Sequence, residues 1–459
     1  MHRDNVLIAL GPLLALTVGG LLLGQGFDSA LAATAGVSVW VILWWVGEPV
    51  PIPVTSLLPM GLFPLLGVMS GKQVALAYGS PLILLLLGGF LLSKAMESTG
   101  AHRKVALLMV SAVGGNSARR LVFGFMLASA LLSMWISNTA VTLMLLPVAL
   151  AVLERARSPE LAVPLLLGLA YSASIGGIGT PIGTPPNLVF MQVYTETTQT
   201  ELSFFEWMTY GVPVVVCLLP LVAWWITRKL GGVSGVELGE RERWTTAQGN
   251  VMIIFALTAL AWMTRKAPFG GWSTWFDVPT ANDAAVAFVA VVLLFTVPNG
   301  KDKRLLDWQT AVNVPWGVLL LFAGSMTLAS AFKISGLSAE IAALPIGIEQ
   351  LPLLLMMFLL AIAVSFLTET TSNTASTTLL MPVLAAAALG AGLDPMLLML
   401  PAAISASCAF MLPVATAPNS VVYGSGHITT QQMAREGFAL NWIGALVVTL
   451  VCYLRMGHL

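Results

Sequence analysis

The chain has 459 residues, of which 57% are hydrophobic and only 9% are charged, and its mean hydropathy is +0.89. Soluble proteins carry about 25% charged residues, so this composition excludes a water-soluble globular protein and predicts a chain that crosses a membrane many times. Lys plus Arg and Asp plus Glu both number 21, so the net charge gives no sign of nucleic acid or of an acidic partner.

The three cysteines, Cys217, Cys408 and Cys452, lie in apolar stretches without paired spacing. This spacing argues against a disulfide framework or a thiolate metal site. We expect all three to pack as small apolar residues.

A membrane-spanning helix needs about 20 mostly apolar residues. Eleven stretches meet this requirement, near 5–25, 30–47, 50–69, 75–98, 162–191, 207–230, 250–266, 281–298, 316–333, 396–425 and 436–456. The first is interpreted as a retained helix because another span follows at once, and Ala30-Leu31-Ala32 leaves a cleaved signal peptide as the alternative. Tryptophans near span ends are expected to be interfacial anchors, namely Trp44, Trp45, Trp207, Trp224 and Trp225.

Two further apolar stretches, 121–153 and 351–390, are each interrupted by the tripeptide Ser-Asn-Thr. We call residues 137–139 the first tip and residues 372–374 the second tip. The arms on either side are about 15 residues long, too short to cross a bilayer comfortably. We therefore expect two re-entrant helical hairpins, with an ordinary kinked pair of spans as the alternative at each place.

The basic residues are distributed unevenly if the N-terminus is cytoplasmic and each hairpin returns to its own side. Sixteen of the 21 lysines and arginines, including Lys94, Arg157 and Arg241, then lie on the cytoplasmic side. The outside loop 192–206 contains three glutamates and no basic residue. This bias agrees with the positive-inside rule and places the C-terminus outside.

The chain also repeats itself. Three motifs recur in one order with offsets of 236, 235 and 232 residues: 88–100 on 324–336, 137–151 on 372–386, and 184–187 on 416–419. Five full spans separate the two copies, so the second copy enters the membrane from the opposite side. An inverted repeat with polar breaks in both halves is typical of secondary transporters, whose site lies at the repeat interface.

Each half also contains a span broken by proline and glycine, at 176–187 and at 412–420. We call these the first and second breaks. Freed carbonyls with Ser, Thr and Asn oxygens can coordinate Na⁺, while the helix that restarts after each tip offers N–H groups to an anion. We infer that sodium and anion transport are coupled because the charges of the two co-substrates compensate each other in one cavity. Glu369, near the second tip, is either functional or a structural hydrogen-bond acceptor.

No histidine is assigned a proton-relay role. His102, His427 and His458 fall in predicted loops or the tail, and His2 is terminal. We find no buried basic residue near the tips and no nucleophile–base or metal constellation in the spans, so an enzyme is not expected. A channel is a further alternative, although an inverted repeat with two unwound spans fits alternating access better.

At the tips and breaks the sequence resembles the divalent anion/sodium symporter family, through essentially the whole chain. The resemblance implies a homodimer in which a mobile transport domain moves like an elevator against a scaffold domain. It implies a small dianionic substrate: C4-dicarboxylates, citrate, 2-oxoglutarate or sulfate. Most members are sodium symporters and some are exchangers.

The resemblance also implies site residues. A first sodium would use Ser133 and Asn138 with carbonyls near Ser137 and Gly183, and a second Asn373 and Ser376 with carbonyls near Thr371, Ala415 and Ala417. The anion would contact Ser137, Asn138, Thr139, Thr184, Ser372, Asn373, Thr374 and Thr416. The second break has Ala417 where many relatives have proline, which leaves its geometry and anion preference open.

We therefore predict an all-α polytopic membrane protein with about eleven transmembrane helices and two re-entrant hairpins in an inverted-topology repeat. The predicted regions are an extra helix at 1–29, repeats at 30–230 and 250–456, a scaffold near 5–98 and 250–333, and a transport domain from 121–230 and 351–456. The expected function is sodium-coupled symport of succinate, malate or fumarate in a bacterial inner membrane. Exchange of dicarboxylate or 2-oxoglutarate, or a preference for citrate or sulfate, is the alternative.

Overall fold

The computed structural model describes residues 2–113, 117–156, 158–230, 243–266, 270–343 and 351–456. Arg157, Arg241 and His458 lie outside the described residues. Within them the secondary structure is almost entirely helical, and an isolated β-bridge pairs Pro298 with Arg304. Ten of the described helical segments are long and apolar enough to cross a membrane. The predicted all-α, multi-pass class is confirmed.

The N-terminal part combines helices of 19 to 23 residues, close to the predicted spans, with shorter helices. Its helices are α1 (His2–Gly24), α2 (Ser29–Gly47), α3 (Ile52–Thr55), α4 (Leu58–Leu65), α5 (Gly71–Tyr78), α6 (Pro81–Thr99) and α7 (Ala101–Val113). The predicted span 50–69 is divided between α3 and α4, where Pro59 at the start of α4 lacks an N–H donor. Helix α7 was not expected, and His102 is a buried residue of this helix rather than a loop residue.

The first hairpin and the first broken span follow. Their helices are α8 (Ala118–Ser133), α9 (Asn138–Ala156), η1 (Pro159–Leu161), α10 (Ala162–Gly177), α11 (Pro185–Thr198) and α12 (Phe204–Thr227). Arm α8 has 16 residues, as expected, but α9 has 19 and is longer than predicted. The break between α10 and α11 lies inside the predicted segment.

The second half is built from the same kinds of element. Its helices are α13 (Thr246–Met263), α14 (Gly271–Trp275), α15 (Asp283–Thr296), α16 (Trp308–Ala311), α17 (Trp316–Ile334), α18 (Leu337–Ala342), α19 (Leu353–Leu367), α20 (Asn373–Gly390), α21 (Met396–Ser405), α22 (Ala417–Tyr423) and α23 (Thr430–Met456). The unwound backbone begins after Ser405, earlier than the predicted Leu412, and α20 has 18 residues rather than about 15.

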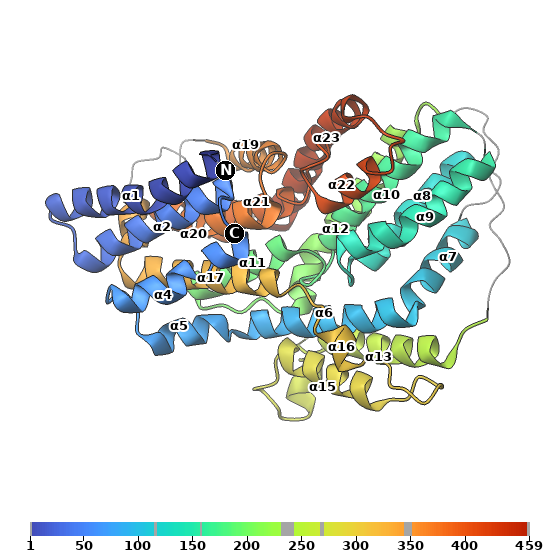
Figure 1. The fold of residues 1–459 in the computed structure, drawn as a ribbon, viewed down its shortest axis with the longest axis horizontal. Coiled ribbons are helices and arrows are strands. Elements are labelled where there is room, and N and C mark those ends of the chain that lie inside the picture. Colours follow the sequence, from blue (N-terminus) through green and yellow to red (C-terminus); the bar gives the residue numbers. More distant parts are fainter. Residues whose placement is uncertain are drawn as a thin grey trace.

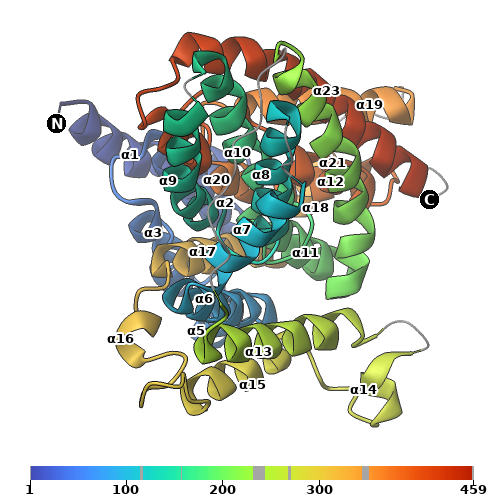
Figure 2. The ribbon, with the colours of Figure 1, turned by 90° about the vertical axis from the view of Figure 1, so that its right-hand side faces the viewer.

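The helices fall into two groups (Figures 1 and 2). Helices α5, α6, α13 and α15 lie on one side, and α8, α10, α12, α21 and α23 lie on the other. Both arms of the first hairpin pack against α10, and both arms of the second pack against α21. Each hairpin also contacts the other half of the chain: α9 packs against α22, while α20 packs against α11. One arm of each hairpin thereby lies beside the broken span of the other half.

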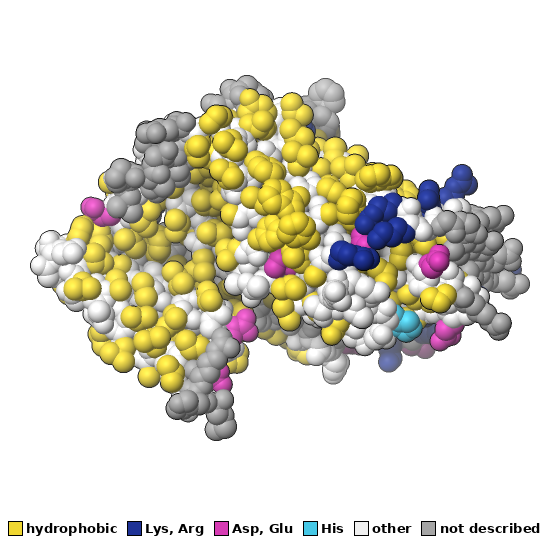
Figure 3. Space-filling model, turned by 90° about the horizontal axis from the view of Figure 1, so that it is seen from above, with side chains coloured by type: hydrophobic (Ala, Val, Ile, Leu, Met, Phe, Trp, Pro, Cys, Tyr) yellow, Lys and Arg dark blue, Asp and Glu magenta, His cyan; other side chains and the backbone are white. Residues whose placement is uncertain are grey.

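The surface is that of a membrane protein. Hydrophobic side chains cover much of the face in Figure 3, and Lys and Arg side chains gather toward one end of it. Helix α1 lies along α2, where Trp44 Nε1 donates to Leu7 O at 3.0 Å, and its Leu16 is 77% exposed. An apolar side chain this exposed suits contact with lipid tails rather than water.

Two predicted interfacial anchors are instead internal. Trp45 is 1% exposed and donates to Ser56 Oγ, and Trp207 is fully buried and donates to Ile178 O at 2.9 Å. Each indole bridges two helices, and that contact buries it. Trp224 is 64% exposed. Cys217 is exposed, contrary to the expected packing, whereas Cys408 and Cys452 are buried.

Candidate functional site

At the first tip, three oxygen atoms converge on one end of the Asn138 carboxamide. Ser133 Oγ lies 2.5 Å away, and the carbonyl oxygens of Ala173 and Gly183 each lie 3.2 Å away. Because these neighbours can all accept, the amide nitrogen faces them. If the Asn138 carboxamide rotated by half a turn, its Oδ1 would face the same point as these three oxygens. A bound ion would then meet four oxygen ligands, a set that suits a hard cation.

Glycines of the first break make this cluster possible. A Cβ on Gly177 would lie 2.8 Å from Asn138 Oδ1 and 3.1 Å from Gly183 O. A Cβ on the adjacent Gly176 would lie 2.1 Å from Ala130 O of α8. Only a residue without a side chain allows α10 and the hairpin to approach this closely.

The second tip presents a similar set of oxygens. Thr371 Oγ1 and Ser376 Oγ are 2.6 Å apart, and Ser372 Oγ accepts from Ala375 N at the start of α20. The Asn373 Oδ1 atom is buried and has no hydrogen-bond partner. A buried amide oxygen without a partner is costly, so this atom is suited to a bound cation or a donor group of a ligand.

The two breaks are held by the same contacts. Asn187 Nδ2 donates to Gly177 O at 2.9 Å and to Thr180 O at 2.8 Å. Asn419 Nδ2 donates to Ala409 O at 3.3 Å and to Leu412 O at 3.0 Å. In both cases the acceptors lie ten and seven residues before the asparagine. Each asparagine therefore clamps the unwound backbone that precedes its half-helix.

Glu369 is a hydrogen-bond acceptor behind the second tip. Its carboxylate accepts from the backbone N–H groups of Phe410, Met411 and Leu412 at 2.7 to 3.1 Å, and from Asn441 Nδ2 at 2.7 Å. Of the two roles left open for Glu369, the geometry favours the structural one. The carboxylate ties the hairpin to the second break, where neutral amides stabilise its charge.

Two neighbouring cavities lie near the first tip, and residues of the tip line one of them. The larger, of about 580 Å³, is lined by Ser137 and Thr139 of the tip and by Ser93, Lys94, Glu97 and His102. The second, of about 570 Å³, shares Lys94, Glu97 and Asn313 with it. No described residue of the second tip lines either cavity.

A separate polar network joins the two groups of helices. Arg265, 3% exposed, contacts Asp283 Oδ1 at 2.6 Å and Glu201 Oε1 at 2.8 Å, and Lys266 contacts Glu201 Oε2 at 2.9 Å. Burial opposes ionisation of Glu201, but its bonds to Lys266 and Arg265 outweigh burial, so the pKa of Glu201 is lowered.

Among the described residues, one lysine and one arginine are buried, although the sequence suggests no buried basic residue near the tips. Arg265 is ion-paired, and Lys104, 8% exposed, lies with Nζ 5.7 Å from the centre of the Trp244 ring. Neither residue lines the two cavities beside the first tip. The tips themselves are built from neutral groups.

The structure places the predicted site residues in several settings. Ser133, Asn138 and Gly183 form one cluster, and Thr371 and Ser376 touch each other. Thr184 and Thr416 are the N-cap residues of α11 and α22, and Thr416 Oγ1 accepts from Asn419 N at 3.2 Å. Ala415 is buried and Ala417 is the exposed first residue of α22.

Sequence reasoning missed Ala173, Gly177 and Asn441. Ala173 contributes a backbone carbonyl, which any residue carries, so no sequence signal could have found it. Gly177 stands in the glycine-rich first break, which was noticed for its flexibility rather than for its close approach to Asn138. Asn441 lies in an apolar span, and an amide there is itself a signal of a polar partner.

Comparisons with known proteins give a consistent result. A family model described as a citrate transporter matches residues 42–403. The sodium-dependent dicarboxylate transporter SdcS of Staphylococcus saprophyticus is 37% identical over 97% of this chain and 90% of its own length. The protein of the same name from Staphylococcus aureus is 36% identical over 98% of this chain and 90% of its own length.

A solved structure shares the fold. The YdaH transporter of Alcanivorax borkumensis, whose crystal structure is described as revealing an unusual topology, aligns with a TM-score of 0.57 at 15% identity. The alignment covers 86% of this chain and 89% of that chain. At this identity the likeness shows the fold alone.

Proposed function

Because the chain belongs to the citrate transporter family, we propose that it is a sodium-coupled secondary transporter of small dicarboxylates such as succinate, malate or fumarate. The observation that carries this proposal is the cluster of oxygens around Asn138, which suits Na⁺ and contains no fixed charge. The description of the family model names citrate as the transported substrate. The relatives that match nearly the whole chain are instead named as dicarboxylate transporters. We therefore take citrate as the alternative substrate.

The first sodium would be held by Ser133, Asn138 and Gly183, with the Ala173 carbonyl as an added ligand. The second would be held at Thr371, Asn373 and Ser376, with carbonyls from Ala415 and Ala417. The orphaned Asn373 Oδ1 supports that assignment, since a cation would supply its missing partner.

The dianion would lie between the two tips. Helices α9 and α20 begin at Asn138 and Asn373, so each presents free N–H groups and the positive end of its dipole there. The proposed contacts are Ser137, Asn138, Thr139, Thr184, Ser372, Asn373, Thr374 and Thr416. Sodium ions beside the tips would offset the two negative charges, which makes binding of each co-substrate depend on the other.

The matching asparagine clamps and hairpin contacts support an inverted repeat. We propose that helices from 121–230 and 351–456 form a transport domain that moves against a scaffold from 5–98 and 250–333. By the distribution of basic residues, the N-terminus is cytoplasmic and the C-terminus outside, in a bacterial inner membrane. A homodimer is part of this proposal.

The test is sodium-dependent uptake of radiolabelled succinate into proteoliposomes. Asn138→Ala and Asn373→Ala should each abolish uptake, while Asn250→Ala on α13, whose amide contacts a loop carbonyl, should leave it unchanged. Monodispersity in detergent checks that each variant folds. Uptake that persists in both tip variants contradicts the assignment. Counterflow that needs no sodium would show an exchanger instead, and a panel with citrate and sulfate identifies the anion.

A further inference from the structure

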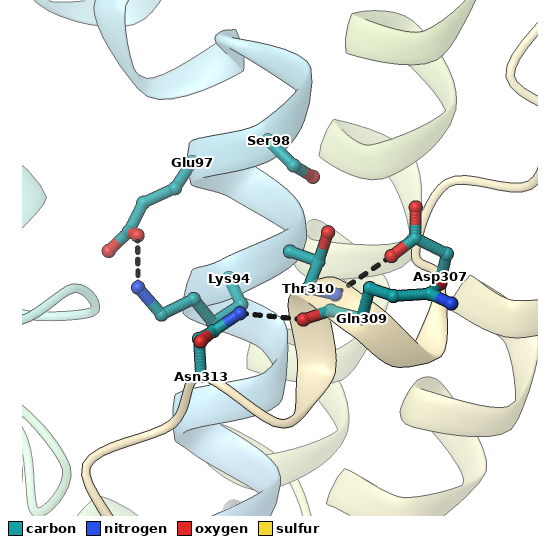
Figure 4. Close-up of a pocket in the computed structure, with 7 residues that line it drawn as sticks. All are labelled: Lys94, Glu97, Ser98, Asp307, Gln309, Thr310 and Asn313. Atoms are coloured by element: carbon teal, nitrogen blue, oxygen red, sulfur yellow. Dashed lines mark hydrogen bonds and ion pairs between the residues drawn. The ribbon is translucent and has the colours of Figure 1, made fainter.

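Lys94 and Glu97 stand where the two cavities beside the first tip meet. Both residues lie on α6, and both line the cavity that contains Ser137 and Thr139 as well as the neighbouring one. Figure 4 shows their side chains reaching toward each other from one face of the helix, with Asn313 close to Lys94. Lys94 Nζ lies 2.8 Å from Glu97 Oε2.

Lys94 is the only lysine or arginine among the described residues that line these two cavities. The side chains of Lys94 and Glu97 are 27% and 24% exposed, so water screens their pairing only in part. His102 also lines the larger cavity, but burial lowers its pKa and its Nδ1 lies 2.8 Å from Met96 O. Among the described residues, Lys94 is therefore the lysine or arginine that a carboxylate in this cavity would meet, and Glu97 is paired with it.

We propose that Lys94 is a staging site for a carboxylate of the transported dianion, and that Glu97 is the internal carboxylate that the substrate displaces. The inference rests on the proposed function. A dianion leaving Ser137 and Thr139 can reach Lys94 without leaving the cavity, because all three residues line it. Exchange of one carboxylate for another keeps the Lys94 ammonium paired throughout, so release of the substrate leaves no unpaired cation in the cavity.

Competition by Glu97 gives the site a weak affinity, which suits a residue on a transport path. Binding there must be favourable enough to attract the anion and weak enough to release it. Glu97 is further held by Ser93 Oγ at 3.4 Å from Oε1, so it keeps a partner on the same helix when displaced. A purely structural pair three residues apart on one helix would contribute little to folding and would not affect the substrate.

The experiment is sodium-dependent succinate counterflow in proteoliposomes, because counterflow carries substrate through both faces in each cycle whatever the orientation of the protein. Lys94→Gln should raise the half-saturating succinate concentration about threefold to tenfold, as expected for loss of a partly screened charge pair. Lys94→Arg keeps the charge and should stay close to the wild type. Lys301→Gln removes an exposed lysine elsewhere and is the matched control.

Glu97→Gln removes the competitor and should lower the half-saturating concentration about twofold to fivefold. The double variant of Lys94→Gln and Glu97→Gln should resemble Lys94→Gln alone. If Glu97→Gln instead raises the value as Lys94→Gln does, the pair is structural and the inference is overturned. It is equally overturned if Lys94→Gln matches Lys301→Gln while the wild type is active. Absence of sodium-dependent counterflow in the wild type would instead refute the proposed function.

Discussion

At the scale of single residues, neutral oxygens dominate the tips while one carboxylate organises the backbone behind them. Glu369 receives four donors from α23 and from the backbone that follows α21. Three of these donors are backbone N–H groups of the unwound segment, and that of Phe410 also donates to Asn441 Oδ1, at 3.1 Å. An unpaired buried donor costs about 1 to 3 kcal/mol, so this one side chain stabilises the break substantially.

We predict that Glu369→Gln destabilises the protein. Glutamine keeps one acceptor oxygen but turns an NH₂ group toward the remaining N–H donors, and the loss should be about 2 kcal/mol or more. The measurement is the midpoint of thermal unfolding in detergent, which should fall by several degrees. Glu160→Gln, which changes an exposed glutamate of η1, is the control and should leave the midpoint unchanged.

An unchanged midpoint in Glu369→Gln would show that the carboxylate is already protonated in the folded protein. A protonated carboxyl has a donor of its own, so glutamine would replace it with little change. Stability that instead falls only when sodium is present would point to a direct effect of the charge on the cation.

Sequence reasoning located the chemistry of the tips but not its full surroundings. The repeated Ser-Asn-Thr marked Asn138 and Asn373, because amides are rare in apolar stretches. The Ala173 carbonyl could not be anticipated, since every residue carries one and only the packing of α10 against the hairpin brings this one to Asn138. The choice between the two roles of Glu369 needed the position of the N–H groups that follow α21. The first of them, that of Phe410, lies 41 residues from Glu369 in sequence.

At the scale of elements, clustered proline and glycine marked the two broken spans. The breaks were predictable because proline lacks an N–H donor and glycine is conformationally free, although α12 stays helical through Pro213 and Pro220. The beginning of the second break was not predictable, because the backbone unwinds after Ser405, where the sequence is still apolar and without glycine. Helix α7 was missed for a different reason: it carries Arg103 and Lys104, and a basic segment between spans resembles a loop.

The asparagine clamps lead to a prediction about these elements. Asn187 and Asn419 each direct an amide nitrogen at two backbone carbonyls. Aspartate has the same shape but no donor, so Asn187→Asp and Asn419→Asp would bring an acceptor against two carbonyls. Both variants should lose more stability than the corresponding alanine variants, which leave the carbonyls without a partner but add no repulsion.

Thermal unfolding in detergent, compared across the four variants, measures this order. Asn250→Asp is the control, since its amide contacts Pro298 O at an exposed position where water can replace it. If the aspartate variants were as stable as the wild type, the amide nitrogens could not be the groups that hold the breaks. If only one half responded, the two clamps would not be equivalent, which would weaken the case for the repeat.

At the scale of the whole molecule, polar contacts join helices that we assign to the proposed transport and scaffold domains. Glu201 in the α11–α12 connection pairs with Arg265 and Lys266 after α13. Nearby, Lys333 Nζ of α17 donates to Glu196 O of α11 at 2.8 Å. Domain composition was expected from sequence, but these cross-domain partners depend on the relative position of the domains, which no local pattern encodes.

We predict that Glu201→Gln speeds transport without changing the half-saturating succinate concentration. The pair is half exposed on the Glu201 side, so its contribution is small, and its loss should change the rate by about fivefold at most. Since the pKa of Glu201 is lowered in the folded protein, the ion pair is fully present above the ordinary glutamate pKa and is lost only as the pH falls through the lowered value. Between pH 6 and 8 the wild type and Glu201→Gln should therefore differ by a constant factor. A ratio that varies across this range, or a changed half-saturating concentration, would show that Glu201 acts on substrate binding and not on the contact between domains.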